Sequence, residues 1–127
     1  HKNIKTCKGN IINIGSIYSI LSPNPELYKG TSLSSPAAYS ASKGGLHQLT
    51  KWLAAHLAPN IRVNMISTIG IRNNQSKNFV GRYLKQIPLK KMCKEQDVIN
   101  AINFLALEKS NMITGQNLII DGGYSIL

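Results

Sequence analysis

The chain has 127 residues, 43% hydrophobic content and a formal net charge of +10 at pH 7, which fits one modest globular domain. No apolar run approaches the roughly 18 residues of a membrane span, and no signal-peptide pattern opens the chain. Cys7 and Cys93 are isolated, and His47 and His56 lack a third ligand nearby. These patterns exclude a disulfide framework, and no metal site is predicted. We expect a cytoplasmic protein that does not enter the membrane.

The positive charge is unevenly distributed. No acidic residue occurs between Glu26 and Glu95, whereas seven basic residues fall within 72–94. Three explanations of the excess positive charge stay open. The matching acidic residues could lie in another part of the protein, such as a missing half, or the charge could serve to bind an anionic substrate or cofactor, or nucleic acid. Nucleic acid is the least favoured, because few aromatic residues are interleaved with the basic ones to stack bases.

The first predicted element is a strand over residues 9–16. It is an almost continuous apolar run that ends in small residues, which is typical of a strand buried on both faces of a parallel sheet. Ser16 falls at its carboxyl end, the edge where open α/β sheets bind their ligands. A serine that merely opens a turn is the alternative.

Residues 17–35 are rich in Ser, Pro, Gly and Asn, and we interpret them as a long loop insertion. Loops of this length are unusual in compact domains and are often functional. Tyr28 and Lys29 could contact a substrate from this loop, although a plain surface loop is equally compatible with the pattern.

A helix is predicted over 36–57, capped by Ser34 or Ser35, with four leucines at helical spacing on one face. Trp52 and His56, one turn apart, are candidates for a helix–helix or subunit interface. Tyr39 and Lys43 also stand one turn apart, on one face. A nearby ammonium favours the ionised form of a phenol, whose pKa is otherwise about 10, so the pair suits a tyrosine acting as general acid or base.

The second half of the chain continues the alternation. A strand is predicted over 61–67, a short helix over 79–86, a helix over 95–107 and a third strand over 117–121. The last helix has a predicted buried stripe formed by Val98, Ile99, Ile102, Leu105 and Ala106. This order predicts an α/β fold with a parallel sheet and right-handed crossovers.

Four motifs in this order resemble the carboxyl-terminal half of the short-chain dehydrogenase/reductase family, over nearly the whole chain. They are Ile-Asn-Ile-Gly-Ser ending at Ser16, Tyr39-x-x-x-Lys43, Ile-Arg-Val-Asn at 61–64, and Thr-Gly-Gln running to Asp-Gly-Gly at 114–123. A bare Tyr-x-x-x-Lys is weak, because chance alone would supply one in roughly half of such chains. The insertion before Tyr39 resembles members from flagellin-modification and surface-polysaccharide biosynthesis.

The resemblance implies a partial Rossmann-like doubly wound parallel sheet, with residues 1–127 as a single, incomplete NAD(P)-binding domain. It implies an oxidoreductase that uses NAD or NADP on a carbonyl or alcohol, such as a sugar or nucleotide-sugar. Tyr39 would exchange the proton, Lys43 would hold the nicotinamide ribose, and Ser16 would orient the carbonyl. Backbone around Ile71 would meet the carboxamide, and a homodimer or homotetramer would form.

The departures from the family leave an alternative open. No glycine-rich phosphate loop occurs anywhere, and Ser67-Thr68-Ile69-Gly70 stands where relatives usually have Ser-Pro-Gly-Gly. The chain also begins at His1, so we expect a processed protein or a piece of a longer one. A non-catalytic remnant or oligomerisation module is therefore the competing hypothesis. In either case an isolated half sheet should expose an apolar edge and uncovered helix faces.

Overall fold

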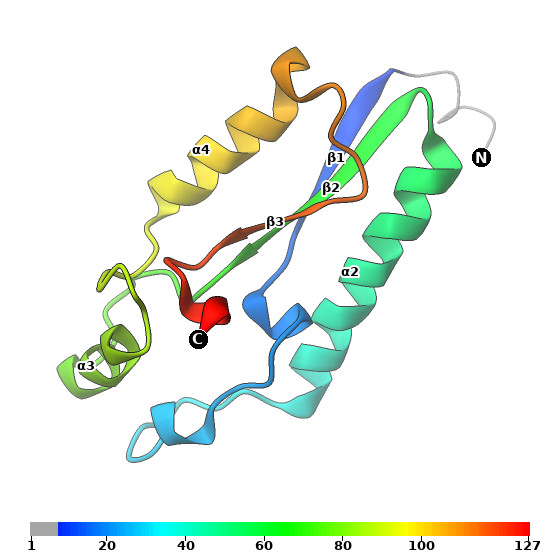
Figure 1. The fold of residues 1–127 in the computed structure, drawn as a ribbon. Coiled ribbons are helices and arrows are strands. Elements are labelled where there is room, and N and C mark those ends of the chain that lie inside the picture. The colour runs from blue at the N-terminus through cyan, green and yellow to red at the C-terminus, as the bar shows by residue number, and fades with distance from the viewer. Residues whose placement is uncertain (1–7) are drawn as a thin grey trace.

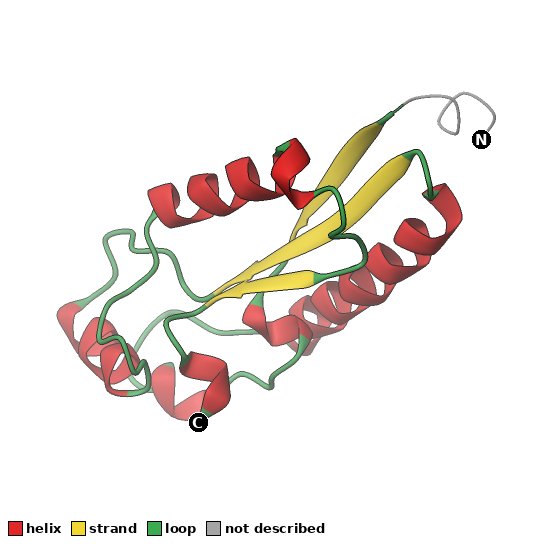
Figure 2. Ribbon diagram, turned by 45° about the horizontal axis from the view of Figure 1, so that its top comes forward, coloured by secondary structure: helices red, strands yellow, loops and turns green. Residues whose placement is uncertain are grey.

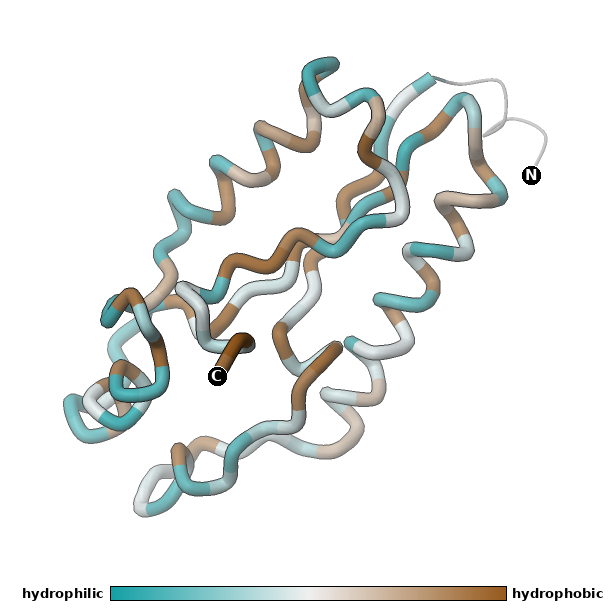
Figure 3. Tube along the Cα trace, viewed as in Figure 1, coloured by the Kyte–Doolittle hydropathy of each residue, from teal (hydrophilic) through white to brown (hydrophobic). Residues whose placement is uncertain are grey.

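The computed structural model describes residues 8–127 and has the α/β fold that the sequence predicts, with a three-stranded parallel sheet (Figure 1). The strands are β1 (Gly9–Ile14), β2 (Ile61–Thr68) and β3 (Asn117–Ile120), and their spatial order is β1-β2-β3. β2 is therefore central and most of its residues are buried. Most residues of β3 itself are apolar (Figure 3).

β1 lies at an edge of this sheet. It pairs with β2 from Gly9 opposite Ile61 to Ile14 opposite Ile66, and within residues 8–127 no strand pairs with its other side. None of its residues is fully buried, and Ile14 is 46% exposed. The strand is therefore less buried than predicted: α2 and α4 contact its two faces, but they cover its residues only in part, and its outer edge is open within the described residues. The exposed apolar edge itself was expected.

Two long helices cover opposite faces of the sheet (Figure 2). On one face, Ala54 of α2 (Ala37–Leu57) packs against Val63 of β2. On the other face lies α4 (Glu95–Ala106), where the Asn10 side chain donates a hydrogen bond to the Ala106 carbonyl at 3.2 Å. Alternate residues of a strand point to opposite faces. In agreement, α2 contacts the odd-numbered Val63 and α4 contacts the even-numbered Asn10.

This arrangement corrects the predicted connections. The crossovers β1-α2-β2 and β2-α4-β3 advance in the same direction across the sheet, yet their helices lie on opposite faces. The two crossovers must therefore have opposite hands, and the prediction that both are right-handed is wrong. The strong handedness preference concerns compact strand–helix–strand units, whereas the second connection first forms α3 (Lys77–Lys85) before it reaches α4.

Short elements build a layer beyond the carboxyl ends of the strands. The interval 17–35 contains two 3-10 helices, η1 (Ile17–Ser19) and η2 (Pro25–Leu27). They share with α3 a core of nine buried residues: Ile17, Leu27, Ile69, Phe79, Val80, Tyr83, Ile87, Met92 and Cys93. Two further 3-10 turns, η3 (Glu108–Ser110) and η4 (Tyr124–Ile126), flank β3.

The amino termini of the helices differ in how they are capped. Pro36 occupies the N-cap position of α2 and no side chain caps it, so the expected cap by Ser34 or Ser35 is wrong. α3 begins two residues before its predicted start, because the Ser76 hydroxyl accepts a hydrogen bond from the Phe79 amide at 3.3 Å.

The predicted helix faces are only partly buried. On α4, Leu105 is buried, but Ile99 is 45% exposed and Ala106 is also exposed. On α2, Leu49 is 47% exposed. These apolar side chains follow helical spacing, but the sheet is too narrow to cover the full width of either helix.

Candidate active site

A cavity of about 400 Å³ opens at the carboxyl ends of β1 and β2. Its lining includes the four residues predicted to bind or act on cofactor and substrate, namely Ser16, Tyr39, Lys43 and Ile71. They come from three segments: the end of β1, the first turns of α2 and the loop after β2. The parallel sheet brings these segments together because its strands end at one edge.

Ser16 lies two residues beyond the end of β1 and is 7% exposed. It is the N-cap residue of η1, and its Oγ accepts a hydrogen bond from the Tyr18 amide at 3.2 Å. Ser16 therefore does open a turn, as the alternative stated. A hydroxyl can also donate, so the capping bond leaves its hydrogen free for a ligand in the cavity.

Tyr39 and Lys43 are adjacent on the first turns of α2. The Lys43 Nζ lies 5.7 Å from the centroid of the Tyr39 ring and donates a hydrogen bond to the Ile14 carbonyl at 3.1 Å. The lysine is therefore held between the helix and the end of β1. Within residues 8–127 the Tyr39 hydroxyl has no hydrogen-bond partner, and the side chain is 41% exposed.

The loop after β2 forms another side of the cavity. Ile71 makes an isolated parallel bridge with Cys93, and its carbonyl accepts a hydrogen bond from the Gln75 side chain at 2.8 Å. The Gly70 amide donates to the Tyr83 hydroxyl at 2.7 Å. These contacts fix the segment in which Thr68 and Ile69 replace the usual proline and glycine.

One side of the cavity is an aromatic wall, most of which was not predicted from the sequence. Tyr18, Phe79 and Tyr83 line the cavity together with Tyr28, which was proposed as a substrate contact. The Tyr18 and Tyr28 hydroxyls lie 2.8 Å apart, and the Tyr18 ring meets the Tyr39 ring edge-on at 6.4 Å. Only the position of Tyr18, two residues after Ser16, could have indicated this wall.

Burial changes the titration of this wall. It raises the pKa of Tyr83 to about 12, although the hydrogen bond from the Gly70 amide acts in the opposite direction. Burial also raises the pKa of Tyr18, and the hydrogen bond with Tyr28 adds to that rise. Both phenols are therefore neutral hydrogen-bonding groups at physiological pH.

Other predicted residues lie away from the cavity. Lys29 is on the surface, where its ammonium pairs with Glu26 at 2.7 Å. Trp52 and His56 stack on α2 with ring centroids 3.8 Å apart, and Trp52 is 50% exposed. Cys93 is a buried free thiol, whereas Cys7 lies outside the described residues.

Two kinds of feature are absent from residues 8–127. None of their helices is both long enough and apolar enough to cross a lipid bilayer. Nowhere in the same range do three or more His, Cys, Asp or Glu side chains gather as metal ligands would.

Relatives with known names match nearly the whole chain. Residues 2–125 match the family described as enoyl-(acyl carrier protein) reductase. The post-translational flagellin modification protein A of Campylobacter coli is 37% identical, and the match covers 96% of this chain and 48% of that protein. The 3-oxoacyl-[acyl-carrier-protein] reductase FabG of Buchnera aphidicola is 34% identical, with 94% and 47% covered. The chain therefore spans about half the length of these relatives.

Solved structures have the same fold. A short-chain dehydrogenase from Leptospira borgpetersenii with bound NAD⁺ superposes with a TM-score of 0.86 at 41% identity, covering 92% of this chain and 44% of that one. A gluconate 5-dehydrogenase from Burkholderia cenocepacia, in complex with NADP and tartrate, gives 0.85 at 25% identity, covering 99% and 49%. The predicted partial Rossmann-like fold is confirmed, and the chain belongs to the short-chain dehydrogenase/reductase family.

Proposed function

We propose that this chain is the catalytic, carboxyl-terminal half of an NAD(P)-dependent oxidoreductase domain, which interconverts a carbonyl and an alcohol. The observation that carries the proposal is the position of Lys43. Its ammonium lies beside the Tyr39 ring and is held by the Ile14 carbonyl, in the cavity that Ser16 also lines. A phenol and a cation adjacent in one cavity, with a hydroxyl nearby, suit proton transfer at a carbonyl oxygen.

Each residue has a role that follows from its position. Tyr39 donates a proton to the carbonyl oxygen in reduction and accepts it back in oxidation. The positive charge of Lys43 stabilises negative charge on the phenol oxygen. The buried Ser16 hydroxyl donates a hydrogen bond to the substrate oxygen, where charge develops. When bound, NAD or NADP supplies the exchange of hydride.

The residues present fit one end of such a cofactor. Lys43 could hold the nicotinamide ribose, and the backbone at Ile71 could meet the carboxamide, because both line the cavity with Tyr39. The Ile71 carbonyl already accepts a bond from Gln75 but retains a second lone pair. The sequence provides no glycine-rich loop for the pyrophosphate, so the fit concerns the nicotinamide end only.

A sugar or nucleotide-sugar is the substrate class that we infer. Two relatives whose names give sugars support it: glucose 1-dehydrogenase 2 of Bacillus subtilis and L-xylulose reductase of Mesocricetus auratus. The cavity supports it too, since aromatic rings form one wall and Lys43 is the one charged side chain among the described residues that line it. An uncharged or anionic ring therefore suits the cavity better than a cation.

The second candidate is a non-catalytic module of the same fold. The observation in its favour is that the sequence has no glycine-rich phosphate loop. In nucleotide-binding sheets of this kind, that loop places backbone amides on the pyrophosphate. Such a module would keep the cavity but would bind NADH or NADPH too weakly to use it.

The deciding experiment is a fluorescence titration of the folded chain with NADH and NADPH, followed by turnover assays on keto-sugars. Catalysis predicts saturable binding and a loss of turnover of at least about a hundredfold in Tyr39→Phe. Tyr124→Phe, a tyrosine that does not line this cavity, is the matched control. Turnover that survives Tyr39→Phe would refute the proton-transfer role, and absence of binding would favour the second candidate.

We also propose that the protein is a cytoplasmic homodimer or homotetramer. The exposed Trp52–His56 stack and the half-exposed Leu49 give α2 an apolar outer surface, and exposed aromatic groups of this kind are enriched at interfaces. Light scattering on the chain and on Trp52→Ser tests this, because the variant should shift the mass toward the monomer.

A further inference from the structure

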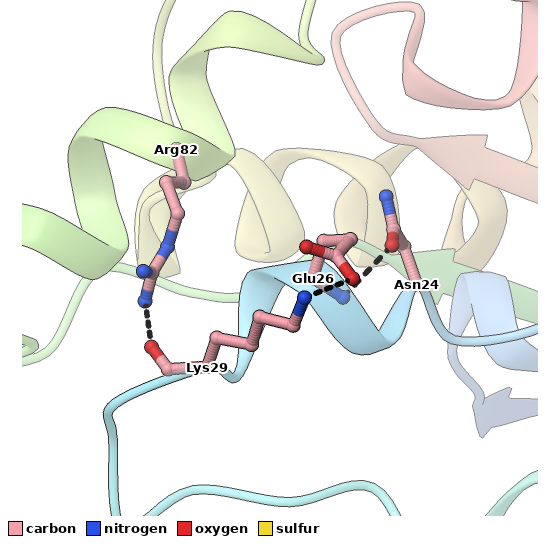
Figure 4. Close-up of polar contacts among 4 residues, drawn as sticks. All are labelled: Asn24, Glu26, Lys29 and Arg82. Atoms are coloured by element: carbon pink, nitrogen blue, oxygen red, sulfur yellow. Dashed lines mark hydrogen bonds and ion pairs between the residues drawn. The ribbon is translucent and has the colours of Figure 1, made fainter.

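Arg82 joins two segments of the cavity wall that are more than fifty residues apart in sequence. It lies on α3, and its Nη2 donates a hydrogen bond to the Lys29 carbonyl at 2.7 Å (Figure 4). The same nitrogen donates another to the Leu27 carbonyl at 3.1 Å. Both carbonyls belong to the carboxyl end of η2 and the residues after it. We call these two bonds the Arg82–η2 contact.

The chemistry explains why an arginine is found here. Carbonyls at the end of a helix lack intrahelical donors, and a cationic side chain can satisfy them and interact favourably with the helix dipole. A guanidinium supplies several donors in a fixed plane, which a lysine ammonium does not. The ion pair that the structure describes on this segment is a separate one between Glu26 and Lys29, whose side chains are 65% and 70% exposed.

The η2 segment carries a residue of the cavity. Tyr28 follows directly after η2, its ring lies 6.1 Å from that of Phe79 on α3, and its hydroxyl meets that of Tyr18. The neighbouring Leu27 is fully buried in the core that Phe79 and Tyr83 share. Phe79 and Tyr83 stack on each other at 5.4 Å. The Arg82–η2 contact thus ties the backbone on both sides of Tyr28 to the helix that presents Phe79 and Tyr83.

We propose that Arg82 is a positioning residue, which holds η2 against α3 so that Tyr28 stands in a preformed aromatic wall of the cavity that Tyr39 also lines. That this wall meets a substrate rests on the function proposed above, whereas the contact and its effect on Tyr28 do not. Without Arg82, η2 would remain attached through Leu27, but Tyr28 would leave its place beside Tyr18 more often. Substrate selection would then weaken without any change in the proton-transfer residues.

Amide hydrogen exchange of the chain tests the contact without requiring turnover. The Leu27, Tyr28 and Thr31 amides donate to the carbonyls of Asn24, Pro25 and Tyr28 respectively, so their protection reports whether η2 is in place. In Arg82→Ala we expect their exchange to accelerate about tenfold, because two carbonyls lose their donor. Arg82→Lys should produce a smaller acceleration. Lys29→Gln, which removes only the exposed ion pair with Glu26, should leave the rates unchanged.

A second readout follows Tyr28 itself. With fluorotyrosine incorporated, fluorine NMR should show the Tyr28 signal shifted or broadened in Arg82→Ala and unchanged in Lys29→Gln, with Tyr28→Phe identifying the signal. Unchanged exchange in η2 would overturn the proposal. So would an equal acceleration at the Met65 amide, which pairs with Gln116 in the sheet, because Arg82 would then act on global stability. A chain that binds no cofactor but shows the expected exchange would refute the proposed function and leave the positioning role standing.

Discussion

The carboxyl end of the sheet and the outer surfaces of its two long helices differ in how far their apolar side chains are buried. Nine buried residues form one core around the cavity, whereas the buried cluster between α2 and β2 contains only Ala54, Ile61 and Val63. Outward from these, Leu49 and Trp52 on α2 and Phe104 on α4 are each about half exposed. The part of the molecule that forms the candidate site is therefore also its best-packed part.

This difference has a physical cause. The loops beyond the strands fold back on one another and bury Ile17, Leu27 and Ile69 from three segments. The helices instead lie on a sheet of three strands, which cannot cover them. Stability of the described chain should therefore depend on the cavity end far more than on the helix surfaces.

The largest expected effect comes from a pair of leucines that differ only in burial. Leu27 has no exposed surface, and Leu49 is 47% exposed. Truncation of a buried leucine to alanine costs about 2–5 kcal/mol, through lost burial and the cavity left behind. Leu27→Ala should lower the free energy of unfolding by about 3 kcal/mol in urea titrations, and Leu49→Ala by less than about 0.5 kcal/mol. Equal losses in the two variants would show that the packing difference has no energetic meaning.

The next effect concerns Asp121, which is 7% exposed at the carboxyl end of β3. Its two carboxylate oxygens accept hydrogen bonds from the Gly123 and Ser125 amides, each at 2.8 Å. Burial works against its charge, but a hydrogen bond from the Ser125 side chain, together with these amide bonds, outweighs burial and lowers the pKa of Asp121. Its contribution to stability is therefore present above the ordinary carboxyl pKa of about 4 and is lost as pH falls through the lower folded value.

Asp121→Asn should destabilise the chain by about 2 kcal/mol at neutral pH, because an amide nitrogen cannot accept the Ser125 bond. Urea titrations at pH 7 and below pH 4 would measure the difference, which should shrink in acid. A penalty that is the same at both pH values would mean that the carboxylate charge is irrelevant. Glu108→Gln on the exposed turn after α4 is the control for loss of one acidic group.

The same comparison shows what could be predicted from the sequence. The family resemblance predicted that Ser16, Tyr39, Lys43 and Ile71 belong together. Strand ends and the helical four-residue spacing explain why their positions depend little on packing between distant segments. They do line one cavity. The fold class followed from the alternation of strands and helices in the same way.

Features that depend on packing between distant segments were not predictable. Phe79 and Tyr83 fall within the short helix predicted over 79–86, and their place in the cavity depends on how α3 packs beyond the sheet end. The hand of the second crossover and the exposure of Ile14 likewise depend on which surfaces the rest of the chain covers. No local pattern carries that information.

A smaller effect is expected at Tyr83, which anchors the loop after β2 at the candidate site. Tyr83→Phe keeps the ring but removes the acceptor of the Gly70 amide, and Gly70 is exposed enough for water to replace it. We expect a loss of about 1 kcal/mol at pH 7.

The same residue makes stability depend on alkaline pH. Burial raises the pKa of Tyr83 to about 12, so its neutral form favours the folded state. Stability should therefore decline as pH rises from about 10, the pKa of a free phenol. Urea titrations at pH 7 and 11 should show a gentler decline in the variant, although Tyr18 continues to contribute. An unchanged decline would assign the alkaline sensitivity to other groups.

The smallest effect is expected on the outer surface of α4. Phe104 is 47% exposed, and Phe104→Ser should change the free energy of unfolding by less than about 0.5 kcal/mol. The variant should nevertheless reduce light scattering from concentrated samples, because exposed apolar area promotes association. A loss of 2 kcal/mol or more would show that Phe104 is buried against the rest of the chain in solution. The outer surface of α4 would then belong to the core, and the difference in burial between the cavity end and this helix would not hold.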